Sequence, residues 1–96
     1  MVRRRARIDS NQTEIVNALR TIGAEVTILS GVGHGVPDIL VSYAGKWYVI
    51  EIKDGDKVPS AQKLTPDEVA WAEKQKAPVY VVNSVVRAIQ VLQGNR

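Results

Sequence analysis

The sequence predicts an α/β fold, in which a mixed four-stranded sheet is flanked by helices in the order αβββαβα. Two neighbouring apolar segments, 39–43 and 46–53, are separated by Ala44-Gly45, which indicates a tight hairpin of two central strands covered on both faces. A helix start at Thr65–Glu68 then precedes a fourth apolar strand at 79–82, so this crossover can be parallel. The 96 residues fit one domain with one core, spanning 1–96.

Capping residues and periodicity predict the other elements. Asn11 and Glu14 have the spacing of a capping box, so the first helix is expected to begin at Ser10 or Asn11. The remaining expected elements are a strand at 25–29, a glycine-rich loop at 30–37 and a last helix capped by Ser84. Trp47 is expected in the core or in an interface, and Trp71 in the core.

The composition is that of an ordinary globular chain without disulfides. Apolar residues make up 45% of the chain and charged residues 24%. Cysteine is absent, which excludes disulfides and thiolate metal sites and favours a reducing, cytoplasmic location. No apolar run reaches the roughly 18 residues of a membrane span, and no apolar segment of a secretory signal follows the basic N-terminus.

The first nine residues form a basic arm, expected to be flexible. The net charge is +3, and four of the 13 Lys and Arg residues are Arg3, Arg4, Arg5 and Arg7. Such an arm can neutralise phosphates and add sequence-independent affinity for nucleic acid. A solvated chain end explains the same residues equally well, so the arm alone does not decide the function.

Two acids and a lysine stand out in the apolar strands. Glu51 and Lys53 share one face of the strand 46–53, because residues two apart on a strand point the same way. If Ala44-Gly45 is the hairpin turn, Asp38 lies opposite Glu51, with Cβ atoms roughly 4.5–5.5 Å apart. Two carboxylates at that distance repel each other, and a divalent cation between them turns the repulsion into binding energy.

This carboxylate pair predicts a metal site. Hard oxygen ligands suit Mg²⁺ or Mn²⁺, and the backbone carbonyl of Ile52 could add a further oxygen. Lys53 could orient or deprotonate a water or stabilise charge on a phosphate, so the pattern indicates hydrolysis of a phosphodiester. Two alternatives stay open. Asp38, Glu51 and Lys53 could form a structural acid–lysine pair rather than a metal site. Glu14 could cap the first helix rather than contribute a third carboxylate.

At these residues the chain resembles the PD-(D/E)XK nuclease superfamily. Pro37-Asp38 and Glu51-Ile52-Lys53 match its pattern, and the element order matches its restriction-endonuclease-like core. More closely, the chain is similar to the small stand-alone VRR-NUC proteins of phages and bacteria. This resemblance covers nearly the whole chain and rests on residues 14–16, 19–20, 35–40, 51–55 and 64–68.

The resemblance implies a Mg²⁺- or Mn²⁺-dependent, structure-selective DNA endonuclease that resolves four-way (Holliday) junctions as a homodimer. If a phage encodes the protein, the location would be the host cytoplasm. Position by position, Asp38 and Glu51 would be metal ligands, Lys53 the catalytic lysine, and Glu14 the acid of the first helix and a further ligand.

One departure from the family concerns a glutamine near the start of the helix after the third strand. This chain has Glu68 there, whereas Gln62 lies upstream in the expected loop. The sequence does not show which of the two takes the role of that glutamine.

Other residues have weaker signals for DNA contact. His34, Lys57 and Lys63 could touch phosphates, although an exposed loop histidine and scattered surface lysines need no function. Two rival functions remain: a non-catalytic nucleic-acid-binding module with a nuclease fold, and a general duplex or flap nuclease.

Overall fold

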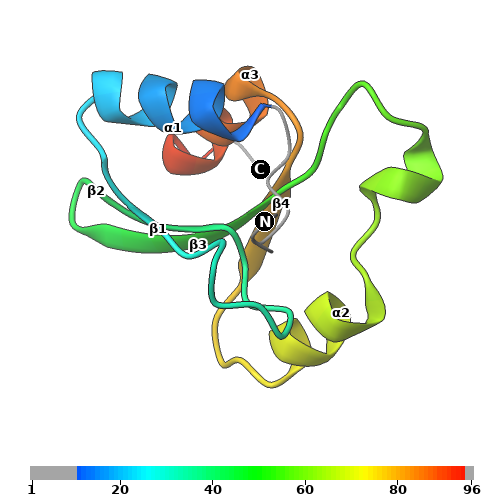
Figure 1. The fold of residues 1–96 in the computed structure, drawn as a ribbon. Coiled ribbons are helices and arrows are strands. Elements are labelled where there is room, and N and C mark those ends of the chain that lie inside the picture. The colour runs from blue at the N-terminus through cyan, green and yellow to red at the C-terminus, as the bar shows by residue number, and fades with distance from the viewer. Residues whose placement is uncertain (1–10, 95–96) are drawn as a thin grey trace, which may run out of the picture.

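The computed structural model describes residues 11–94, which form one mixed sheet with helices around it (Figure 1). The strands lie in the spatial order β1-β2-β3-β4, with bounds β1 (Glu25–Ile28), β2 (Ile39–Tyr43), β3 (Lys46–Ile52) and β4 (Val79–Val82). The helices are α1 (Gln12–Thr21), α2 (Pro66–Glu73) and α3 (Val85–Leu92), with a 3₁₀ turn η1 (Pro59–Gln62). The sheet is antiparallel except between β3 and β4, so the predicted element order and the parallel crossover are confirmed.

The β2–β3 hairpin has the predicted turn and register. Ala44 and Gly45 have φ angles of 50° and 81°, and positive φ at both central residues is the mark of a type I′ turn. The turn pairs Ile39 with Ile50. Continuing this register by one residue brings the segment that carries Asp38 opposite Glu51.

Replacing Ala44 with asparagine is expected to stabilise the protein by about 1 kcal/mol, because asparagine tolerates the left-handed conformation that costs alanine energy. Ala44→Val places a β-branched residue at the same angle and is expected to shift stability in the opposite direction. Urea denaturation of both variants measures the two changes in the free energy of unfolding. Equal stability of the two variants would contradict the type I′ turn.

The core lies between one face of the sheet and the helices α1 and α3, which lie side by side over that face in Figure 1. Its largest fully buried side chains come from all these elements: Ile15, Leu19, Ile39, Val41, Ile50, Ile52, Val82 and Val91. The helices are short, and within residues 11–94 none is long and apolar enough to cross a membrane.

The opposite face of the sheet is only partly covered, which corrects the prediction of cover on both faces. Trp47 is 71% exposed, and α2 contributes no buried residue, with Trp71 only half-buried. The expectation that Trp71 lies in the core is therefore wrong. Trp47 is not in the core either, which leaves an interface as the other place expected for it. Since Ile50 and Ile52 face the core, the alternation of the strand directs Glu51 and Lys53 to this partly covered face.

The capping box predicted at α1 is absent. Asn11 occupies the N-cap position, but its side chain makes no bond to the first turn of the helix. Its Nδ2 instead donates to the carbonyls of Lys53 at 3.0 Å and of Asn83 at 3.3 Å. These bonds hold the side chain by its nitrogen, while Oδ1, the atom that would accept a capping bond, has no hydrogen-bond partner within residues 11–94. They tie the start of α1 to the end of β3.

Candidate active site

Asp38, Glu51 and Lys53 meet in one pocket of about 340 Å³ on the partly covered face of the sheet. Its walls come from the start of β2, the end of β3, the segment that follows β3 and the start of α2. The lining residues are Asp38, Glu51, Ile52, Lys53, Lys57, Ala61, Thr65 and Glu68. The hairpin thus brings together the three residues that the sequence singled out.

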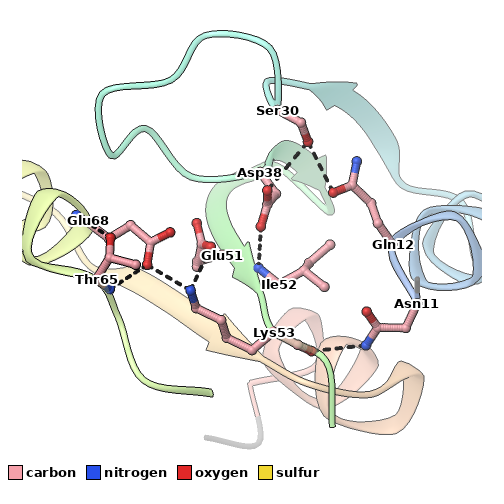
Figure 2. A network of polar contacts seen from close by, with 9 residues as sticks. All are labelled: Asn11, Gln12, Ser30, Asp38, Glu51, Ile52, Lys53, Thr65 and Glu68. Carbon is pink, nitrogen blue, oxygen red and sulfur yellow. Dashed lines mark hydrogen bonds and ion pairs between the residues drawn. The ribbon is translucent and has the colours of Figure 1, made fainter. Parts of the chain in front are cut away.

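Asp38 is held in place from several sides, as Figure 2 shows. Its Oδ2 accepts a hydrogen bond from the backbone N–H of Ile52 at 2.7 Å, and its own N–H donates to the carbonyl of Ile50 at 3.1 Å. The hydroxyl of Ser30 lies 3.5 Å from Asp38 Oδ1 and 3.1 Å from Oε1 of the buried Gln12. The carboxylate is therefore oriented by β3, by the loop after β1 and, through Ser30, by α1.

Lys53 lies between two carboxylates and is nearly buried, with 8% exposure. Its Nζ is 3.4 Å from Glu51 Oε2 and 2.8 Å from Glu68 Oε1. Glu68 belongs to a capping box at α2, in which Thr65 Oγ1 accepts from the Glu68 N–H and Glu68 Oε1 accepts from the Thr65 N–H. The predicted α2 start is confirmed, and its glutamate reaches into the pocket (Figure 2).

The charges of the pocket change the protonation of Glu51. Burial, followed by the negative charges of Asp38 and Glu68, raises the pKa of Glu51 from 4.5 to about 9, against the opposing effect of Lys53. Without a cation, Glu51 therefore carries a proton at neutral pH. Crowded acids of this kind are common at functional sites.

Lys53 and Glu68 form the charged pair of the pocket. Burial alone would lower the pKa of Lys53, but its hydrogen bond to Glu68 and the attraction of both glutamates outweigh burial and raise that pKa. Burial likewise acts to raise the pKa of Glu68, and the hydrogen bonds from Lys53 and Thr65 reverse this and lower it. Lys53 is consequently an ammonium group at neutral pH, and Glu68 is a carboxylate.

The structure does not bring Glu14 to the carboxylate pair. Glu14 is exposed and lines a separate depression with Asn11 and Asp54. Successive residues of a helix turn by about 100°, so positions 12 and 14 face in nearly opposite directions, and the residue of α1 that points toward Asp38 is Gln12. The sequence did not reveal that Gln12 and Ser30 support Asp38. No local pattern marks Gln12, two positions before Glu14, as a buried residue of the helix.

Gln62 has a structural place in the segment that follows β3. Its Nε2 donates to the carbonyl of Lys57 at 2.6 Å, and its Oε1 accepts from Asn83 Nδ2 at 2.9 Å. Gln62 does not line the pocket, whereas Glu68 does. The helix residue that faces the acids is thus Glu68.

The candidate DNA-contacting residues lie at different distances from the pocket. Lys57 lines it, while Lys63 and His34 are exposed and do not. The arginines of the basic arm, Arg3, Arg4, Arg5 and Arg7, lie outside the described residues.

The donor atoms of the pocket fit a hard divalent cation. Asp38 and Glu51 provide carboxylates from two strands, and the raised pKa of Glu51 marks an excess of negative charge that a cation would relieve. Within the described part of the chain, no three or more His, Cys, Asp or Glu side chains are arranged around one metal position. A cation here would rest on the two carboxylates, with backbone oxygen and water completing its shell, as Mg²⁺ commonly does.

The fold is similar to that of a nuclease-type domain. The structure is similar to a solved VRR_NUC domain, with a TM-score of 0.59 and 26% sequence identity over 88% of this chain and 92% of that chain. This similarity supports the VRR-NUC resemblance of the sequence and confirms the mixed four-stranded sheet with flanking helices. No protein-family model matches the sequence, and no curated protein does.

Proposed function

We propose that the protein is a Mg²⁺- or Mn²⁺-dependent endodeoxyribonuclease that hydrolyses phosphodiester bonds. The observation that carries this proposal is the opposed Asp38–Glu51 pair with the Lys53 ammonium beside it, in one pocket. The similarity to a VRR_NUC domain supports nuclease activity and DNA as the substrate.

The paired acids and the two lysines of the pocket have different tasks in this reaction. Asp38 and Glu51 would hold the cation, with the backbone carbonyl of Ile52 as a further ligand. When bound, the cation polarises the phosphate and lowers the pKa of a water molecule. Lys53, whose raised pKa keeps it charged, stabilises negative charge on the phosphate and is poorly suited to remove a proton. Lys57 at the rim offers a second cation for a phosphate.

We further propose a homodimer that cuts four-way junctions. A two-fold dimer presents two identical sites, as paired cuts across a junction require. The arm residues Arg3, Arg4, Arg5 and Arg7 would add affinity for phosphates, with His34 and Lys63 as outer contacts. A non-catalytic binding module would not need the intact pair of acids with its lysine, so the pocket favours catalysis.

A cleavage assay on labelled junction, flap, duplex and single-stranded DNA tests the proposal. Cutting of the junction is expected with Mg²⁺ or Mn²⁺ and not with EDTA. Asp38→Asn and Lys53→Ala are each expected to lower the rate at least about 100-fold, because the first weakens the cation site and the second removes a positive charge beside the reacting phosphate. Glu73→Gln, at an exposed position of α2, is the matched control and should cut normally.

Four results would count against parts of this proposal. Cutting in EDTA, or full activity of either pocket variant, would refute the metal mechanism. Equal cutting of plain duplex would remove the junction preference. A monomer in gel filtration at micromolar concentration would remove the stable dimer.

A further inference from the structure

Glu68 is a charged residue of the pocket that metal binding and hydrolysis leave without a task. It comes from α2, whereas the paired acids come from the β2–β3 hairpin. Its contact with Lys53, at 2.8 Å, is shorter than the 3.4 Å contact between Lys53 and Glu51. Lys53 is therefore held more closely by the helix than by its neighbour in the strand.

One oxygen of Glu68 joins two partners. Oε1 accepts from Lys53 Nζ and from the Thr65 N–H, both at 2.8 Å. The second hydrogen bond of the capping box, which the Glu68 N–H donates to Thr65 Oγ1 at 3.3 Å, fixes the N-terminus of α2. The carboxylate is thus pinned at the first turn of α2, and the lysine is tied to that turn.

The backbone of this turn is itself held by the loop that precedes Asp38. A Cβ atom at Gly35 would collide with the backbone carbonyl of Asp67 and lie 3.0 Å from the backbone nitrogen of Glu68. The loop and the start of α2 therefore approach as closely as glycine allows, which sets the position of Glu68 relative to the strand that carries Asp38.

A lysine needs such a support because its side chain has four rotatable bonds and a flexible, point-like charge. A cation on Asp38 and Glu51 would draw on the same Glu51 carboxylate that Lys53 contacts. Glu68 would then remain as the partner of the Lys53 ammonium group. It comes from α2 rather than from a strand, and the cation does not need it as a ligand.

We propose that Glu68 is a positioning residue that couples the Lys53 ammonium to the start of α2 and keeps it beside Glu51. The expected effect on catalysis rests on the proposed nuclease function, whereas the coupling itself can be measured without cleavage.

Steady-state kinetics separate positioning from binding. Glu68→Ala is expected to lower kcat about 10- to 100-fold, with KM and Mg²⁺ affinity changed by less than about threefold. Glu68→Gln keeps an acceptor at the same place and should recover most of the rate, and Glu73→Ala is the surface control on the same helix. A wild-type kcat in Glu68→Ala, or an equal loss in Glu68→Ala and Glu68→Gln, would overturn the proposal.

The ammonium signal of Lys53, in NMR spectra of protein with ¹⁵N-labelled lysine, reports its order directly. Wild type and Thr65→Ala, which retains the Lys53–Glu68 contact, should show a slowly exchanging signal, and Glu68→Ala should lose it. If Glu68→Ala does not fold, Glu68→Asp withdraws the carboxylate by one methylene and should lose the signal as well. A signal that survives in the Glu68 variants, or that Thr65→Ala removes equally, overturns the positioning role. Absence of cleavage by the wild type would instead refute the proposed function.

Discussion

The metal-free protein is expected to become less stable as the pH rises from about 5 to 9, and Mg²⁺ to remove much of this loss. The pKa of Glu51 is raised from 4.5 to about 9 by burial and by Asp38, so the folded state binds this proton more tightly than the unfolded state. The stability that the proton contributes is complete below pH 4.5, decreases progressively as the pH rises from there, and is gone above the raised value. A cation replaces the proton, so its affinity should rise with pH.

Melting temperatures measured between pH 6 and 9, in EDTA and in Mg²⁺, check this linkage. Glu51→Gln cannot lose a proton and should flatten the profile in EDTA, while Glu73→Gln, an exposed acid of α2, should leave the slope as it is. A flat wild-type profile, or equal stabilisation by Mg²⁺ at pH 6 and pH 9, would show that Glu51 is not protonated in the folded protein.

Gly35→Val is expected to lower cleavage at least about 100-fold while the sheet stays folded. Gly35 has a φ of 83°, and any Cβ there meets the backbone of Asp67, which cannot turn aside as a flexible side chain can. The start of α2 must move, and Glu68 moves away from Lys53. Since α2 contributes no buried residue, the core under α1 and α3 is expected to survive.

Cleavage rates and far-UV circular dichroism of Gly35→Val test this separation. Gly31→Ala is the matched control in the same loop, because nothing lies within 4 Å of a Cβ there and its φ is not positive. A wild-type rate in Gly35→Val would contradict the close approach of the loop to α2. Loss of the whole fold would contradict the independence of the core from α2.

The hairpin and its acids could be predicted from the sequence because local chemistry determines them. Ala44-Gly45 limits the turn to two residues, and a turn of that length leaves one register for the apolar strands around it. Asp38 and Glu51 follow from that register. The capping residues Thr65 and Ser84 were equally readable, since a cap depends on neighbours in the sequence.

Burial and contacts between distant segments could not be predicted in the same way. Trp71 has the apolar neighbours of a core residue, yet α2 stands apart from the other helices, so the tryptophan is only half-buried. Gln12 and Ser30 meet because α1 and the loop after β1 pack together, which neither segment reveals alone. Asn11 likewise has a local cap pattern but bonds to Lys53 and Asn83 instead.

The crossover between β3 and β4 differs from the rest of the described chain in how little the core depends on its sequence. None of the buried apolar residues lies between positions 53 and 81, although this stretch supplies one wall of the pocket. Substitutions in the crossover therefore cost the core little, while they reshape what the pocket admits. Under the proposed function, substrate choice can vary at the other positions of this segment while the hairpin and Glu68 preserve the chemistry. Relatives with different DNA preferences are therefore expected to differ most at those crossover positions.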